Sequence, residues 1–538
     1  MPAKPITPIP LSGMGSSGLN TQAQDSTLGP EWLTQAEGMV FDLQGRIASR
    51  KGIKMVSKAI ASSVKSIAGY IKSNRTREYY AGAGNAIYKI DTSTSPYSLT
   101  AQSFSGSAQT ITDANWTWVN FNDELWGIQA GHKVINYDGT NWYDIDDLGT
   151  YDAASGVTTF DPSCGLGDFG RMWYGGITEA PGVVYYSDNL IGEDLDGGAA
   201  GSVDLKTVWG NDEVVGLASI MDKIVIFGKQ NIAIYTGASN PASMTLEEVI
   251  KGTGLAGKDN IAYVGTDILF LSYEGLMSLG RLQQTDGKAP IQDLSITVRN
   301  DLATILSSAT VANIKTAYYP EDGLLVIFMP DEKKCYVFDV KVQTQSPRVT
   351  TWPFTTAAPL CGLGTIDGNL FIGLSTGVAE YTGYIDVTIT SDGSGGWTST
   401  DSNYSYVFQT SWLDLNSPTF AKIIKSGLFA ITGGRGSSST ISVYKDFELG
   451  SPYTKTISLV SGVTISLYTQ GGDGAALAAG TRSLYDTAKY GAAAGPKDYK
   501  VSLGRTGKVI KLKMDTTVEG HYSSLTAATL LTKQGKIR

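Results

Sequence analysis

Side chains that commonly carry catalysis or bind metals are scarce in this sequence of 538 residues. Its two histidines, His132 and His521, lie far apart, and neither has a second ligand at the spacing of a zinc site. A Ser-His-Asp relay would need one of them, and no Gly-x-Ser-x-Gly elbow precedes a helix. We therefore interpret both histidines as surface or loop residues and expect neither catalytic residues nor an enzyme.

The cysteines indicate no redox or metal chemistry. Cys164, Cys335 and Cys361 form an odd, widely spaced set without a Cys-x-x-Cys pair. Such a set suggests neither a disulfide framework nor a thiolate metal site. We expect three small, buried side chains.

Two kinds of motif raise the possibility of phosphate or cation binding. GLGDFG at 165–170 has the form Gly-x-Gly-x-x-Gly, but it runs into a strand-like segment, where dinucleotide binding needs a helix N-terminus. The acidic runs at 144–149 and 188–198 have enough carboxylates for calcium but lack the spacing that wraps one ion. We expect a turn at the first motif, solvated loops at the others, and neither a cofactor nor a metal site.

Aromatic rings and carboxylates leave one alternative function open, a carbohydrate-binding or glycan-processing protein. Paired carboxylates can serve a glycosidase, and aromatic rings can serve as sugar platforms. The spacing of five clustered tryptophans nevertheless favours a place in a core: Trp116, Trp118, Trp126, Trp142 and Trp173. Trp142 and Asp194 are the residues whose substitution would test this alternative.

The charge of the chain favours no tight contact with nucleic acid. Asp and Glu number 51 against 42 Lys and Arg, a formal charge of −9, and the basic residues form no long cluster. A neutral or acidic wall would let DNA slide past without trapping it. No apolar run approaches the roughly 20 residues of a membrane-spanning helix, and the first residues lack the apolar core of a secretory signal. We expect synthesis in a cytoplasm and no membrane span.

A divergent repeat predicts the fold. A short, strand-like ending recurs seven times at roughly the spacing of propeller blades. The seven endings are GNAIYKID at 84–91, HKVINYDG at 132–139, PGVVYYSD at 181–188, QNIAIYTG at 230–237, EGLMSLGR at 274–281, KKCYVFDV at 333–340 and TGVAEYTG at 376–383. Three units also place a glycine 19 positions before an aromatic residue: Gly69 and Tyr88, Gly216 and Tyr235, Gly362 and Tyr381.

Within the fourth unit, Ile224 and Ile226 fall on one face of a strand, and Val225 and Phe227 fall on the other. A four-stranded meander cannot bury both faces alone, so such units must stack around an axis. The fold class is therefore all-β, a six- or seven-bladed β-propeller. An open sandwich of hairpins is the alternative.

Two regions depart from the repeat. Residues 293–306 place five aliphatic side chains on one helical face and predict a helical insertion, capped by Asp293 or Ser295. After Gly383, alternating segments such as 404–412 and 510–514 predict a β-sandwich-like platform domain.

These patterns divide the chain into four parts. We expect an extended, proline-rich N-terminal arm at 1–35, strands at 36–65 that lead into or join the platform, the propeller at 66–384, and the platform at 385–538. The arm is too proline-rich to fold alone and is the first candidate for a contact with a neighbouring protein.

Several segments of this layout resemble the tail nozzle, or tail hub, proteins of short-tailed bacteriophages, the podoviruses. AEGMVFDLQGRIASRKGIKMV at 36–56 is similar to the family's opening strand pair with its Arg-x-Gly, although Lys51 stands where proline is frequent. The helix at 293–306 with the AYYPEDGLLVIFMP that follows, and TSWLDLNSPTFAKIIKSGLFAI at 410–431, resemble the family's helix and platform strand.

The resemblance implies a structural virion protein without enzymatic activity. It implies a homo-hexameric ring below the head-to-tail adaptor protein, which continues the DNA channel and conducts the genome during ejection without binding it tightly. Tail fibres or tailspikes and a tail-tip or needle protein would be further partners. The protein would be located in the virion tail, after assembly in the host cytoplasm.

Overall fold

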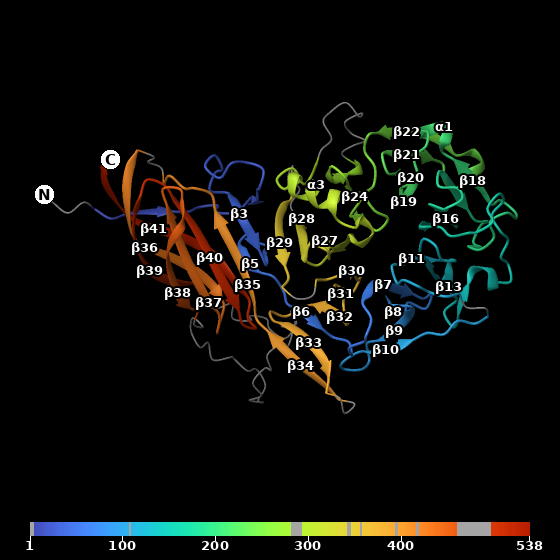
Figure 1. The fold of residues 1–538 in the computed structure, drawn as a ribbon, viewed down its shortest axis with the longest axis horizontal. Coiled ribbons are helices and arrows are strands. Elements are labelled where there is room, and N and C mark those ends of the chain that lie inside the picture. The colour runs from blue at the N-terminus through green and yellow to red at the C-terminus, as the bar shows by residue number, and fades with distance from the viewer. Residues whose placement is uncertain are drawn as a thin grey trace.

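The computed structural model describes residues 5–106, 109–280, 293–341, 346–355, 358–392, 396–415, 419–459 and 496–537. These residues form two bodies: a ring of small sheets on the right of Figure 1, and an elongated sandwich on the left, here called the platform. Among the residues with described positions, no helix is long and apolar enough to cross a membrane.

The first four sheets of the ring, blades one to four, are each built from four consecutive antiparallel strands. Their strands are, blade by blade, β7 (Val64–Ile71), β8 (Arg77–Ala83), β9 (Ala86–Asp91) and β10 (Ser98–Ala101); β11 (Thr117–Phe121), β12 (Glu124–Ile128), β13 (Ile135–Tyr137) and β14 (Trp142–Asp144); β15 (Cys164–Asp168), β16 (Arg171–Gly175), β17 (Val183–Tyr186) and β18 (Gly201–Asp204); β19 (Val214–Ile220), β20 (Lys223–Gly228), β21 (Asn231–Thr236) and β22 (Thr245–Lys251). Short helical turns lie between some of them: η1 (Ile145–Asp147), α1 (Lys206–Trp209) and η2 (Pro241–Ser243).

Blades five to seven depart from this plan. Blade five has three described strands, and the sheet of blade six continues into the platform. Blade seven takes its fourth strand, β6 (Ile53–Met55), from before blade one, and this strand pairs antiparallel with β32. The remaining strands are β23 (Ile261–Val264), β24 (Asp267–Ser272) and β25 (Gly275–Ser278); β26 (Lys315–Tyr319), β27 (Leu324–Met329), β28 (Lys334–Asp339) and β29 (Arg348–Pro353); β30 (Cys361–Gly364), β31 (Leu370–Leu374) and β32 (Gly377–Tyr381).

The predicted propeller is confirmed, and the blades of the described chain number seven. Each of the seven repeated endings contains the third strand of a blade, from β9 in the first to β32 in the last. The ring closes because blade seven packs on blade one: Phe371 and Val378 share a buried cluster with Val64 and Ile67.

The two faces of blade four pack as the alternation in its second strand predicts. Ile224 and Ile226 pack with residues of blade three, including Trp173. Val225 and Phe227 belong to a separate cluster with blade five. Each blade therefore buries its apolar residues against its neighbours, as a propeller requires.

Two of the repeated glycines, in the first strands of blades four and seven, leave room for side chains from the connection to blade five and from blade six. A Cβ atom at Gly216 would lie 2.5 Å from the Leu255 side chain, and one at Gly362 would lie 2.6 Å from the Phe328 ring. Such short distances require one of the two groups to move. Glycine at these two positions is therefore explained by close packing around the ring.

The helical insertion begins later than residues 293–306 suggest. The helix is α3 (Arg299–Ser308), followed by η3 (Val311–Asn313), and the residues from Asp293 to Val298 form a bridge and turns. The Asp293 carboxylate accepts hydrogen bonds from the backbone and hydroxyl of Ser295, and Ser295 accepts one from the Leu276 backbone. Neither residue caps the helix, because these contacts tie the segment to blade five instead.

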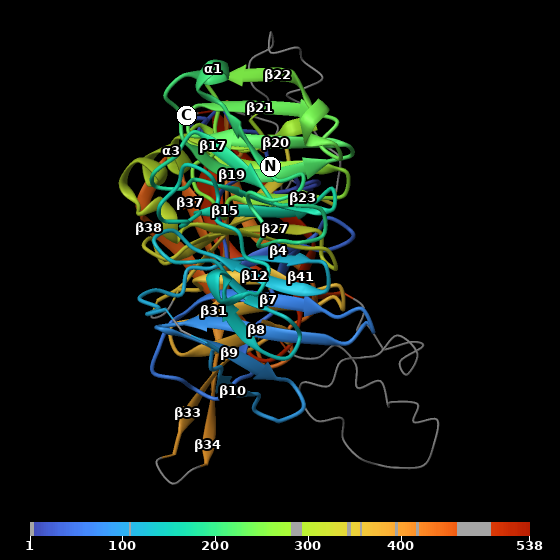
Figure 2. The same ribbon diagram turned by 90° about the vertical axis from the view of Figure 1, so that its right-hand side faces the viewer.

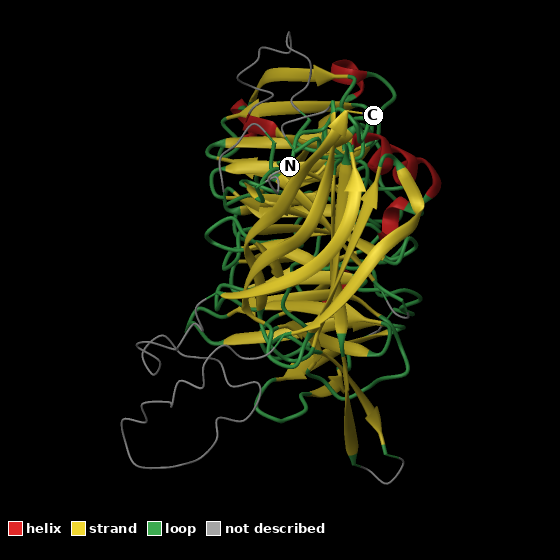
Figure 3. Ribbon diagram, turned by 90° about the vertical axis from the view of Figure 1, so that its left-hand side faces the viewer, coloured by secondary structure: helices red, strands yellow, loops and turns green. Residues whose placement is uncertain are grey.

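The platform is a sandwich of two sheets, whose long strands cross the middle of Figure 3. One sheet extends blade six in the order β29-β3-β35-β40-β37-β38, and the other runs β39-β36-β41-β5-β4 with β1 on β41. The strands are β1 (Thr7–Pro10), β2 (Gly18–Leu19), β3 (Trp32–Glu37), β4 (Met39–Phe41), β5 (Ile47–Ser49), β35 (Tyr404–Thr410), β36 (Phe420–Gly433), β37 (Ser438–Lys445), β38 (Glu448–Ser458), β39 (Lys497–Gly507), β40 (Ile510–Val518) and β41 (Ser523–Ile537).

The predicted arm at 1–35 is, over its described residues, part of the platform. β1 pairs with β41, and β3 lies between β29 and β35 inside the larger sheet. Pro8 and Pro10 fit β1 because that strand is at a sheet edge, where missing donors are tolerated. The described residues of the arm therefore find partner strands far away in their own chain, Thr7 opposite Thr532 and Leu33 opposite Thr410.

The predicted boundary at 385 also moves. Residues after it form a hairpin, β33 (Asp386–Ser391) and β34 (Trp397–Ser402), that extends the sheet of blade seven through β6. The C-terminal strands of the platform begin only at β35. Figure 2 shows the hairpin projecting from the lower edge of the molecule.

Candidate functional site

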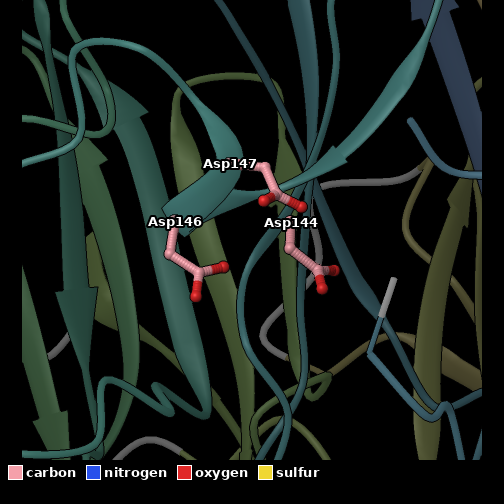
Figure 4. Close-up of side chains that lie close together, drawn as sticks. All are labelled: Asp144, Asp146 and Asp147. Atoms are coloured by element: carbon pink, nitrogen blue, oxygen red, sulfur yellow. The ribbon is translucent and has the colours of Figure 1, made fainter. Parts of the chain in front are cut away.

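Among the described residues, three aspartates at the end of blade two form a group whose carboxylates lie close enough together to share an ion (Figure 4). Asp144 ends β14, and Asp146 and Asp147 follow in η1, so one tight turn brings their carboxylates together. One oxygen from each lies within 4.8 Å of the others. Asp144 is fully buried, whereas Asp146 and Asp147 are exposed, so the solvated loop expected at 144–149 is wrong for its first residue.

The hydrogen bonds of this cluster explain its geometry without an ion. Asp144 accepts bonds from the Gln109 backbone (2.7 Å) and from the Gln109 side chain (2.8 Å), and Asp146 pairs with Lys133. Burial raises the pKa of Asp144, and the charge of Asp146 raises it further, against the opposing effect of Gln109. Both Asp144 oxygens are engaged, so the cluster joins a loop to blade two and offers few free oxygens to a cation.

The second acidic run, 188–198, forms turns. Asp188 accepts a bond from the Ala199 backbone (3.0 Å), and Asp194 accepts one from the Gly197 backbone (2.8 Å). The turn predicted at GLGDFG is confined to its last two residues: 165–168 belong to β15, and Phe169 (φ 56°) and Gly170 (φ 70°) join it to β16. Such a pair of residues suits a two-residue hairpin turn.

The histidines and cysteines hold structural positions. His521 is exposed between two strands, as expected, whereas His132 lies in a loop but is only 9 % exposed. The His132 ring contacts the Thr112 backbone N–H at 3.1 Å and the Gln129 side chain at 3.0 Å. The three cysteines are buried and unpaired, as predicted. Burial raises the pKa of the Cys361 thiol to about 11.

The tryptophans that motivated a sugar platform lie in the core. Trp142 is 1 % exposed and stacks on Tyr137 with ring centroids 4.9 Å apart. Trp116, Trp126 and Trp173 are equally inaccessible, and Trp118 is partly buried against the same cluster as Trp142. The four buried rings hold blades together and present no face to a ligand, and Trp118 is the one member of the set with partial exposure.

The sequence analysis missed a charged network that crosses the centre of the ring. The Lys258 ammonium donates to the Asn115 carbonyl (2.7 Å) and to the Thr117 hydroxyl (3.0 Å), and Thr117 donates to Asp259 (2.8 Å). Lys315 completes the network with an ion pair to Asp259 at 3.1 Å. These residues precede or begin the innermost strands of blades two, five and six.

Blade two is not a neighbour of blades five and six, so contacts among them must span the axis of the ring. Burial lowers the pKa of Lys258; burial alone would raise the pKa of Asp259, but Lys258 and Lys315 hold it below its usual value. The network therefore bridges opposite blades across the axis of the propeller. No local pattern in the sequence signals it, because Thr117 and Asp259 are 142 residues apart.

No protein-family model matches this chain, and no curated protein matches it. Solved structures with a similar path include PorZ of the type-IX secretion system of Porphyromonas gingivalis (12 % identity, TM-score 0.36), streptogramin B lyase (10 %, 0.39) and the WD40 β-propeller domain of Doa1 (9 %, 0.38). The matches cover 66 %, 62 % and 61 % of this chain, and 42 %, 97 % and 96 % of those chains. At such identities the likeness concerns the fold alone and says nothing about activity.

Proposed function

We propose that this chain is the tail nozzle subunit of a short-tailed bacteriophage, a structural virion protein without enzymatic activity. Six copies form a ring below the head-to-tail adaptor, continue the DNA channel and conduct the genome during ejection. The protein assembles in the host cytoplasm and is located in the virion tail, where tail fibres or tailspikes and a tail-tip or needle protein are further partners.

The observation that carries this proposal is the continuous junction between propeller and platform. The sheet of blade six continues from β29 into β3 and β35, with the Gly38 backbone donating to the Thr351 carbonyl at 2.7 Å. A single buried cluster extends from Leu325 of blade six through Leu302 of α3 to Phe408 of the platform. Described residues of the two domains thus share one sheet and one core, and such a body suits the wall of a channel better than an enzyme that closes on a substrate.

The Arg-x-Gly segment of the family resemblance lies at this junction. The Arg50 guanidinium is 3 % exposed and donates two bonds to Asp386, at 2.9 and 2.7 Å, beneath the Tyr404 ring. A Cβ atom at Gly52 would lie 2.1 Å from the Ile385 carbonyl oxygen, so glycine is required there. Lys51, where the family often has proline, pairs with Asp322 at 2.8 Å. These contacts give the resemblance a structural basis in this chain.

The chemistry of the described residues favours this proposal over the carbohydrate alternative. That alternative drew on the clustered tryptophans and the acidic loops; Trp142 is only 1 % exposed, and Asp194 accepts a bond from the Gly197 backbone within its own turn. Lys258 and Asp259 occupy the propeller's own axis, so in the proposed ring DNA passes between subunits and not through a propeller.

Electron microscopy and mass photometry of the purified protein, alone and with the adaptor, test the proposal. Six copies of 57.2 kDa give about 343 kDa, and we expect six-fold rings with a central opening. A particle of one copy that ignores the adaptor would overturn the proposal.

A further inference from the structure

The β33–β34 hairpin stands away from the body of the protein, as Figures 1 and 2 both show. Six residue pairs join its strands, from Asp386 and Ser402 to Ser391 and Trp397. β33 is anchored at its base: Val387 pairs with Lys54, and the Asp386 carboxylate accepts bonds from the Ile53 backbone (2.8 Å) and from Arg50. Among the described residues, no strand pairs with the outer edge of β34.

Little of this hairpin is buried within the chain. Val387 is the only buried side chain of its two strands, and every residue of β34 after Trp397 is exposed. A two-stranded hairpin without further packing is only marginally stable in water. An ordered hairpin at this position therefore favours additional contacts outside its own subunit.

The chemistry of the hairpin suits pairing with a basic surface. One face is formed by the threonine pairs Thr388 with Thr400 and Thr390 with Thr398. The chain has no Lys or Arg between Arg348 and Lys422, so the hairpin carries acidic groups, such as Asp401, and no cation. Lysine and proline are the residues that usually protect an exposed edge from further pairing, and β34 has neither.

A basic surface of matching character lies at one edge of the platform. Residues 419–459 and 496–537 contain 13 Lys and Arg against five Asp and Glu. Each of β38 and β39 has one strand neighbour in its sheet, and Arg505 of β39 donates to the Ser451 carbonyl of β38 at 2.8 Å, so the two edges lie together. Lys455 of β38 and Lys500 of β39 are exposed there.

We propose that the β33–β34 hairpin of one copy docks on the β38–β39 edge of a second copy. The two surfaces differ, so the contact is head-to-tail, and repetition of such a contact closes into a ring when the rotation permits. The inference rests on the proposed function for the ring itself and names one contact within it. The acidic hairpin and the basic edge also oppose wrong pairings, because hairpin against hairpin would bring like charges together.

Two variants, each altering one side of the contact, test this inference. Thr398→Lys/Thr400→Lys adds cations to the exposed edge of the hairpin, and Lys455→Glu/Lys500→Glu reverses the platform edge. Thr100→Lys, an exposed threonine in the edge strand β10 of blade one, is the matched control. Circular dichroism and melting temperature check that all variants fold.

Mass photometry then measures assembly, in whichever condition, alone or with the adaptor, the wild type assembles. We expect each double variant alone to remain monomeric and the Thr100→Lys control to assemble like the wild type. An equal mixture of the two variants retains one native contact per pair and sets the hairpin lysines of one variant against the platform glutamates of the other, so we expect dimers of about 114 kDa, two copies of 57.2 kDa, and larger assemblies built from them.

The outcomes separate the two proposals. Double variants that assemble as well as the wild type, or a mixture that yields no dimer, would overturn the docking contact and leave the ring intact. If one double variant fails to fold, assembly by the other would still overturn the contact. A wild type that stays monomeric in both conditions would overturn the contact and the nozzle together.

Discussion

The propeller and the platform are built in opposite ways. Each blade, apart from the one that closes the ring, consists of strands that follow one another in the chain, whereas the platform combines the first 50 residues with the last 135. They also differ in charge: residues 101–250, which span blades two to four, contain 21 Asp and Glu against five Lys and Arg, while the C-terminal platform strands are basic. Strands that follow one another in the chain leave a local pattern from which a region can be predicted. Pairing between distant segments leaves no such pattern, but it joins two regions into one body.

Removal of a buried aromatic ring from a blade should cause the largest loss of stability, and the loss should be confined to the propeller. Trp142→Ala leaves a cavity beside Tyr137, and we expect a loss of about 3–5 kcal/mol in the free energy of unfolding. Urea denaturation measures the loss, and hydrogen exchange should show faster exchange in residues 117–144 than in the platform.

Phe447→Ala, on a platform residue that is 59 % exposed, is the control and should cost less than about 1 kcal/mol. A Trp142→Ala protein of unchanged stability that lost binding on a glycan array would contradict the core assignment and revive the carbohydrate alternative.

Loss of the ion pair at the junction should cause the second-largest loss of stability. It should also make the propeller and the platform unfold separately. Arg50→Ala leaves Asp386 without its bidentate partner, and we expect a loss of about 3 kcal/mol. Calorimetry should then show two transitions where the wild type shows one, because the domains no longer unfold together. Arg299→Ala, whose side chain is 49 % exposed, is the control, and an equal effect there would argue against a special role for the junction.

The many carboxylates of the propeller should make the free energy of unfolding depend on pH. Burial, with the charges of Glu193, Asp138 and Asp123, raises the pKa of Glu124 from 4.5 to about 7. The folded protein therefore keeps this proton between about pH 4.5 and pH 7 while the unfolded chain releases it, so stability falls as the pH rises through this window.

Glu124→Gln removes this effect. We expect the variant to exceed the wild type by about 1 kcal/mol above pH 7, less than the full shift implies because Glu124 is partly exposed, and to match it below pH 4.5. Denaturation at several pH values measures the difference. Parallel pH profiles of the two proteins would show that Glu124 does not titrate in this range.

The smallest effect should come from the exposed ion pair beside the three aspartates. Lys133 and Asp146 are 44 % and 38 % exposed, so Lys133→Ala should cost less than about 1 kcal/mol. Thermal melting with and without calcium measures both stability and binding. A calcium-dependent rise of several degrees would contradict our description of this cluster as a structural turn.

The sequence predicted the blades well, because their signals are local. The third strands repeat, and Ile224 to Phe227 alternate between two neighbours as their pattern indicates. It predicted the platform and strands at 36–65 that lead into or join it, where β4 and β5 lie, but not the strands within the supposed arm, since the partner of Thr7 is Thr532 and nothing near Thr7 indicates it.

The same limit explains the two other differences. The helix begins later than expected because Asp293 and Ser295 take part in contacts that join their segment to blade five. Helical periodicity carries no information about such contacts. The axial network escaped prediction because its members come from blades on opposite sides of the ring. Lysines and aspartates near strand starts are common, and only their convergence distinguishes Lys258 and Asp259.

The closure of the ring by β6 has a consequence for the order of synthesis. β6 emerges from the ribosome before any blade, but its partner β32 ends only at Tyr381. Blades one to six can pack as they emerge, whereas the ring stays open until more than 300 further residues have been translated. A nascent chain paused before that point therefore exposes the apolar face of blade one that blade seven later covers, and it is at this stage that we expect the chain to depend most on chaperones.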